Sequence, residues 1–241
     1  MDAIITKNLI KKYGDLTAVD NLNLTVEKGE LFALLGVNGA GKTTAIKMLS
    51  CLSAPTSGDA ELLGDSVTRN PAAVKRKINI SPQETAVAEN LSVRENLELI
   101  AGLYGQDAKS ARANALLMAE RFGLTEVLKK KAKKLSGGMQ RRLSIALALI
   151  TNPEILFLDE PTLGLDVLAR RELWHLIKGL KGKVTIILTT HYLEEAEALS
   201  DHVGVMAKGK LSAVGTPVEL MAQTGTAKLE DAFIVLNGGL L

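Results

Sequence analysis

One glycine-rich segment limits what this chain can fold into more than any other part of it. Residues 36–43 read GVNGAGKT, directly after the apolar run 31–35 and before a segment with helical pattern from Lys42 to about Cys51. Two glycines five positions apart, followed by lysine and threonine between a strand and a helix, are typical of a phosphate-binding loop. The alternative, a glycine-rich turn with a stray lysine, does not account for that setting. We therefore predict that the loop from Gly36 to Thr44 binds phosphate.

The chemistry of a nucleotide explains this spacing. Glycines let successive backbone N–H groups converge on phosphate oxygens, and the start of a helix turns its positive end toward the same anion. Lys42 would supply a cation for the β- and γ-phosphates, and the hydroxyl of Thr43 can bind Mg²⁺. The loop alone does not separate an ATPase from a GTPase or a kinase. The expected nucleotide-binding residues here are Gly36, Asn38, Gly39, Ala40, Gly41, Lys42, Thr43 and Thr44.

A second apolar strand ends in two carboxylates. The run 155–158 leads directly into Asp159 and Glu160. Asp159 at the strand end is placed to hold Mg²⁺, and Glu160, one residue later, can polarise an attacking water. A single carboxylate there would be an ordinary acidic turn or helix cap, whereas two in a chain with the glycine loop favour catalysis. The chain has no Asn-Lys-x-Asp motif of the kind that reads guanine, so we expect ATP hydrolysis.

With these motifs in place, the chain resembles the nucleotide-binding subunit of an ABC transporter. The segment 135–140, LSGGMQ, is similar to the signature sequence of that family, although the family more often has glutamine where Met139 stands. Ser136, Gly137 and Gly138 would open a helix and form a second anion-binding helix start. The resemblance implies that this helix start caps the γ-phosphate bound by a facing subunit, so that two chains enclose two ATP molecules.

The same resemblance implies roles for four further side chains. Tyr13 would stack on adenine, and Gln83 would contact Mg²⁺ and link the core to the helical segment. Asp166 would communicate across the dimer, and His191 would contact the γ-phosphate and orient Glu160 and the water. By itself, a histidine such as His191 is more often a capping or surface residue, and a tyrosine near a turn is commonplace.

The order of strand and helix patterns indicates one α/β core that is interrupted by helices. Short strands fill the N-terminal part, segment 92–151 is helical in pattern, and strands alternate with helices again after Pro153. Ser92 and Glu95 have the spacing of a reciprocal helix-start box. The resemblance implies a P-loop NTPase with a RecA-like core, an N-terminal antiparallel β-subdomain and an inserted α-helical subdomain. We expect a single domain over 1–241, with core and β-subdomain in 1–83 and 152–241 and the insertion in 84–151.

The resemblance also implies partners. The LSGGM variant, the sequence PQE at 82–84 and the LEDAF ending at 229–233 look like the branch that exports drugs, antibiotics, lipids or sodium. A membrane-spanning permease would dock on the helical insertion, especially on 84–104. The second nucleotide-binding subunit is a copy of this chain in the simplest assembly, and a homologous subunit remains an alternative.

Composition sets limits on location and ligands. No apolar run approaches the ~18 residues of a membrane span, and the single cysteine, Cys51, fits a reducing compartment. We expect a cytoplasmic protein that is held at the inner face of the cell membrane by its permease. A net charge of +2 and only 3% aromatic residues give no reason to expect a nucleic-acid partner. The basic run 129–134 is either a solvated surface or a patch that lies near the cytoplasmic leaflet or draws in ATP.

Three other functions would each use only part of this set of motifs. A soluble ABC-type ATPase that acts on ribosomes or DNA would usually carry two such domains or a long coiled coil before the signature. A small-molecule kinase would have no use for segment 135–140. A regulatory protein that only binds ATP would not need Glu160 and His191.

Overall fold

A six-stranded sheet forms the centre of the molecule in the computed structural model, which describes residues 1–239. Its strand order is β11-β10-β4-β9-β8-β7, and all neighbours are parallel except β10 and β11. The carboxyl ends of β4, β8 and β9 therefore meet at one edge, where ligands of such sheets bind. The strands are β4 (Leu31–Leu35), β7 (Ile78–Ser81), β8 (Ile155–Asp159), β9 (Thr185–Thr190), β10 (His202–Ala207) and β11 (Lys210–Gly215).

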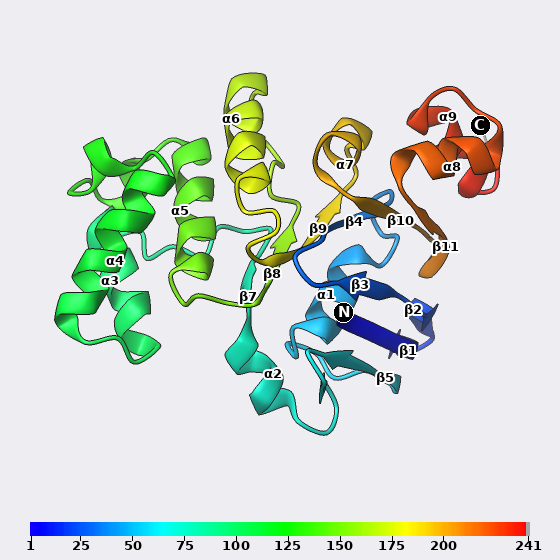
Figure 1. The fold of residues 1–241 in the computed structure, drawn as a ribbon, viewed down its shortest axis with the longest axis horizontal. Coiled ribbons are helices and arrows are strands. Elements are labelled where there is room, and N and C mark those ends of the chain that lie inside the picture. Colours follow the sequence, from blue (N-terminus) through cyan, green and yellow to red (C-terminus); the bar gives the residue numbers. More distant parts are fainter. Residues whose placement is uncertain (240–241) are drawn as a thin grey trace.

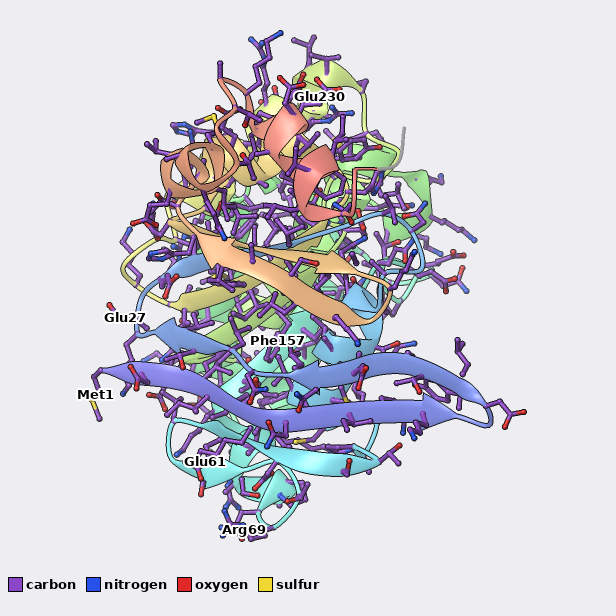
Figure 2. All side chains as sticks on the ribbon, turned by 90° about the vertical axis from the view of Figure 1, so that its right-hand side faces the viewer. Met1, Glu27, Glu61, Arg69, Phe157 and Glu230 are labelled. Carbon is purple, nitrogen blue, oxygen red and sulfur yellow. The ribbon has the colours of Figure 1, made fainter. Side chains whose placement is uncertain are left out.

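Both faces of this sheet are buried, and successive side chains along a strand pack against opposite faces. Leu31 and Leu35 of β4 pack into a core shared with the helical insertion, whereas Phe32 packs into a second core on the opposite face. The second core also contains residues of the first helix and of the N-terminal strands. Figure 2 shows Phe157 of β8 in the interior above the N-terminal strands. Burial on both sides explains why β4 and β8 are continuously apolar in sequence.

A second, antiparallel sheet is built from the N-terminal strands, in the order β2-β1-β5-β6 with β3 also on β1. The expectation of short strands was wrong for β1, which runs for 12 residues with several bulges in its pairing. Strands β2 and β3 are separate: between them the Thr6 hydroxyl donates to Leu22 O and accepts from Leu24 N. The strands are β1 (Asp2–Tyr13), β2 (Leu16–Leu22), β3 (Thr25–Glu27), β5 (Ser57–Leu62) and β6 (Asp65–Ser66).

Two groups of helices lie at opposite ends of the molecule. Figure 1 shows α3, α4 and α5 together on the side away from the antiparallel sheet, while α8 and α9 lie near the C-terminus. The short helix α2 was not predicted from the sequence. No helix within residues 1–239 is long and apolar enough to cross a membrane. The helices are α1 (Lys42–Leu49), α2 (Pro71–Lys77), α3 (Val93–Leu103), α4 (Ala108–Arg121), α5 (Gly137–Leu149), α6 (Val167–Lys178), α7 (Leu193–Leu199), α8 (Pro217–Thr224) and α9 (Leu229–Leu236).

The expected fold class is confirmed. An α/β core carries an antiparallel β-subdomain at its N-terminal side and a helical segment inserted between β7 and β8. The reciprocal box at the start of α3 is also confirmed: Ser92 Oγ accepts from Glu95 N at 3.3 Å, and Glu95 Oε2 accepts from Ser92 N at 2.7 Å.

The box gives a test of the helical segment. Replacement of Ser92 by alanine removes the hydroxyl cap of α3, so the free energy of unfolding should fall by about 1 kcal/mol. Urea unfolding followed by the fluorescence of Trp174, the single tryptophan, measures this change. Ser212→Ala, on the exposed part of β11, is the control and should change stability by less than about 0.5 kcal/mol. An equal loss in both variants would contradict the assigned cap.

Candidate functional site

The glycine loop between β4 and α1 is held by close backbone packing. A Cβ at Gly36 would lie 2.5 Å from Met206 O, and one at Gly41 would lie 2.4 Å from Ala18 O, so neither position accepts a side chain. Gly39 and Gly41 also have positive φ, at 82° and 104°. Two backbone hydrogen bonds fix the loop to its surroundings: Gly36 N donates to Thr190 O, and Gly209 N donates to Ala40 O. The loop is therefore packed closely on its inner side, and its other side lines a cavity that is open to a ligand.

Glu160 lies between two of the residues that the sequence singled out. Its Oε1 is 3.2 Å from Lys42 Nζ, and its Oε2 is 2.8 Å from His191 Nδ1. Lys42 and Glu160 are both buried, whereas His191 is partly exposed. Lys42 Nζ also donates to Gly36 O at 2.7 Å, inside the loop. The structure thus brings together the phosphate loop, the second carboxylate and the histidine that follows β9.

Asp159 lies beside Thr43. Thr43 Oγ1 donates to Asp159 Oδ1 at 3.1 Å, and Thr189 Oγ1 donates to the same oxygen at 2.5 Å. Hydroxyl and carboxylate oxygens side by side suit Mg²⁺, which prefers oxygen ligands and keeps several from water and phosphate. No group of three or more His, Cys, Asp or Glu side chains in residues 1–239 could hold a metal alone. The residues present therefore fit a cation that is bound together with a nucleotide.

A cavity of about 590 Å³ opens in front of the loop. This volume is within the usual range for small-molecule sites. Tyr13 stands at its margin, with half of its surface exposed, and Gln83 is also exposed there. Its lining combines the phosphate loop with catalytic candidates from three other strand ends: Tyr13, Leu16, Thr17, Ala18, Asn38, Gly39, Ala40, Gly41, Lys42, Thr43, Thr44, Gln83, Glu160, Leu163, His191, Lys208 and Gly209.

The signature segment does not reach this cavity. Ser136, Gly137 and Gly138 line a separate hollow of about 260 Å³, together with Asp166. Ser136 caps α5 by accepting from Met139 N, and Asp166 caps α6 by accepting from Ala169 N. The structure therefore separates Ser136 to Gly138 and Asp166 from the phosphate loop of their own chain.

Several residues near the site were missed by sequence reasoning. Thr189 holds both Asp159 and the backbone N–H of Glu160, and Lys208 and Gly209 bring the β10–β11 turn into the cavity wall. Arg141, in the first turns of α5, reaches the backbone around Glu160. No pattern in the sequence shows that the β10–β11 turn touches the loop. Thr189 and Arg141 contact backbone and side chains that are distant in the sequence, so no local motif marks them.

The sequence of this chain is similar to those of known proteins. The profile of the ABC transporter family matches residues 19–163. The daunorubicin resistance ATP-binding protein DrrA3 of Streptomyces coeruleorubidus is 44% identical over 95% of this chain and 72% of its own length. The probable multidrug ABC transporter ATP-binding protein YbhF of Escherichia coli is 40% identical over 97% of this chain. The chain spans only 41% of the length of that second relative.

Solved structures agree with the sequence relatives. An ATP-binding subunit of an ABC transporter superposes with a TM-score of 0.86 at 30% identity, covering 97% of this chain and 99% of that one. The ATP-binding cassette MJ0796, solved as a dimer in a post-hydrolysis state with ADP and Pi, superposes with a TM-score of 0.80 at 27% identity. That match covers 88% of this chain and 98% of the other.

A buried carboxyl lies next to the site without being part of the cavity wall. Glu195 on α7 is fully buried, and its Oε1 accepts from Trp174 Nε1 at 3.0 Å. Its Oε2 has no hydrogen-bond partner among the described residues. Burial raises the pKa of Glu195 above its ordinary value of 4.5. A raised carboxyl pKa in the folded protein favours the protonated form, so this group supports folding at low pH and opposes it once it ionises.

Replacement of Glu195 by glutamine tests whether ionisation of this carboxyl lowers the stability of the folded protein. The amide keeps an oxygen for Trp174 but cannot ionise, so the variant should be more stable than the wild type at pH 8. The advantage should shrink as the pH falls toward 4.5, where the unfolded carboxyl also becomes protonated. Urea unfolding at several pH values measures the difference, with the exposed neighbour Glu194→Gln as the control. A Glu195→Gln variant whose advantage grows toward acid would contradict the assignment.

Proposed function

This chain belongs to the ABC transporter family, as an ATP-binding subunit with the family's ATPase fold, and we propose that it drives export through a separate membrane-spanning partner. The observation that carries the catalytic part is the position of Glu160, held between Lys42 and His191 at the edge of the phosphate cavity. Export of a drug-like organic compound is supported by relatives that are named for daunorubicin resistance and multidrug transport.

We assign the hydrolytic step to three residues. Water attacks the γ-phosphorus in line, a new P–O bond forms, and the bond to the oxygen of the leaving ADP breaks. Lys42 binds the β- and γ-phosphate oxygens, and Glu160 accepts a hydrogen bond from the attacking water and takes up its proton. His191 orients the Glu160 carboxylate through its 2.8 Å contact and would lie near the γ-phosphate.

Mg²⁺ would be held by the hydroxyl of Thr43, the carboxylate of Asp159 and the side-chain oxygen of Gln83. When bound, it neutralises charge that develops on the phosphate oxygens. The 3.1 Å contact of Thr43 with Asp159 and the place of Gln83 in the cavity wall support this set. Tyr13, on the margin of the same cavity, would stack on the adenine, and the backbone N–H groups from Asn38 to Thr44 would bind the phosphates.

A head-to-tail dimer would complete the site. Ser136 to Gly138 open α5 and line a hollow apart from the phosphate cavity of their own chain, which supports a role on the nucleotide of a second subunit. Asp166 lies in the same hollow and would take part in contact across that interface. The dimeric MJ0796 structure supports this assembly. A second copy of this chain is the simplest partner, because one chain carries both halves of the site.

The permease would dock on the helical insertion. Exposed apolar side chains gather on α3 and α4 and at the residue after α3, where an apolar partner surface could cover them. These side chains are Leu99, Leu103, Tyr104, Leu116 and Leu117. Docking there would place the chain at the inner face of the membrane, with Gln83 at the start of the connection between the core and these helices.

Substitution of Glu160 by glutamine tests the catalytic proposal. The amide keeps the shape of the site but cannot take up a proton, so ATP hydrolysis should fall by at least about 10²-fold while ATP still binds. The ATP-bound dimer should then persist long enough to be seen by light scattering after gel filtration. Glu61→Gln, on β5 of the antiparallel sheet, is the control and should hydrolyse ATP like the wild type. Wild-type turnover by Glu160→Gln would overturn the assignment of the base.

A further inference from the structure

Arg141 is a buried cation whose hydrogen bonds all go to backbone carbonyls. It stands in the first turns of α5 and exposes only 4% of its surface. Nε donates to Pro161 O at 2.8 Å, and Nη2 donates to Asp159 O at 2.7 Å. Nη1 donates to Pro82 O and, at 3.3 Å, to Gln83 O. The planar guanidinium fork suits such a set, since its five N–H groups point in fixed directions.

The carbonyls that accept hydrogen bonds from Arg141 belong to two short segments of the site. Those of Asp159 and Pro161 flank Glu160 on its two sides, and those of Pro82 and Gln83 belong to the segment that carries the proposed Mg²⁺ ligand. One side chain of α5 therefore fixes the backbone of two separate parts of the site.

The backbone of Glu160 needs such a restraint. Its φ is 47°, in the left-handed region that non-glycine residues rarely occupy. A strained conformation persists only where the surroundings over-determine it. Thr189 fixes the N–H of Glu160 through two contacts, at 3.0 and 3.1 Å, and Arg141 fixes the carbonyls before and after it.

The charge of Arg141 persists in this environment. Burial lowers the pKa of Arg141 to about 10, and the nearby carboxylates of Asp159, Glu195 and Glu160 oppose that shift. The guanidinium is therefore protonated at neutral pH and keeps all of its donors. No ion pair with a carboxylate is formed by Arg141 among the described residues, so its contacts are directed at the backbone.

We propose that Arg141 is a positioning residue for ATP hydrolysis, which holds the backbone of Glu160 and of Gln83 in place from the signature helix α5. The inference rests on the proposed role of Glu160 as the base. Since Arg141 and Ser136 stand on the same helix end, a movement of the partner-facing turn would also move the support of Glu160. Arg141 itself lies outside the lining of the nucleotide cavity.

Arg141→Met is the direct test, because methionine fills the space without donating hydrogen bonds. Displacement of a catalytic group by about 1 Å can cost on the order of 10²-fold in rate, so kcat should fall by roughly 10- to 10²-fold. KM for ATP should stay within about twofold of the wild type, because Lys42 and Tyr13 are untouched. Arg141→Lys keeps the charge and part of the hydrogen bonding, and its kcat should lie between the two.

A matched control separates positioning from general destabilisation. Ser144 lies one turn further along α5, and its hydroxyl contacts the Ser81 hydroxyl at 2.9 Å, with both side chains buried. Ser144→Ala therefore removes a buried polar contact between α5 and β7 without touching Glu160, and its kcat should match the wild type. Trp174 fluorescence during urea unfolding shows the folded fraction of each variant. If Arg141→Met does not fold, the comparison of Arg141→Lys with Ser144→Ala decides.

The double variant tests whether Arg141 acts through Glu160. In a Glu160→Gln background, Arg141→Met should reduce the rate by much less than in the wild type, because the base is already gone and only the support of Gln83 is left to lose. A wild-type kcat in the folded Arg141 variants, an equal loss in Ser144→Ala, or the full loss repeated in the Glu160→Gln background would each overturn the proposal. Wild-type turnover by Glu160→Gln alone would instead overturn the assignment of the base.

Discussion

The site depends on the parallel alignment of β4, β9 and β8. Their carboxyl ends lie at one edge of the sheet, so the loop after β4 and the carboxylates after β8 meet across β9. The 3.2 Å contact between Lys42 and Glu160 results from this alignment, and His191 joins Glu160 from the end of β9. Burial strengthens these contacts, because charges interact more strongly where water is excluded. A strand out of register would separate the phosphate loop from the proposed base.

The same geometry leaves Ser136 and Asp166 outside the phosphate cavity. Helix α5 begins with Ser136 at a hollow apart from the phosphate cavity, and the exposed Asp166 shares that hollow. Yet α5 is linked to the proposed base, because Arg141 donates to the backbone carbonyls on both sides of Glu160. In the proposed dimer, one helix would present a surface to the second subunit and would support the proposed base of its own chain. Such a dimer would give the occupation of one site a physical route to the other.

Sequence reasoning reached the parts of the site that have a local pattern. The loop from Gly36 to Thr44 could be predicted because phosphate binding demands a fixed spacing of glycines. Asp159 and Glu160 could be predicted because they end an apolar strand. The resemblance to the family pointed to Tyr13, Gln83, Asp166 and His191. Thr189, Lys208 and Arg141 could not be predicted, because each lies beside backbone or side chains that only the fold brings near. The length of β1 was missed because bulges in its pairing interrupt the alternation that marks a strand.

A complementation experiment tests most directly whether each site is shared by two chains. Lys42→Ala disables the phosphate loop, and Ser136→Arg disables the surface offered to the partner, so each variant alone should be inactive. In a mixed dimer, the intact loop of the Ser136 variant meets the intact signature of the Lys42 variant, and one of the two sites is whole. We expect ATP hydrolysis to return on mixing, up to about half of the wild-type rate per mixed dimer if the two sites act independently. A mixture that stays as inactive as its components, although light scattering shows mixed dimers, would contradict the shared site.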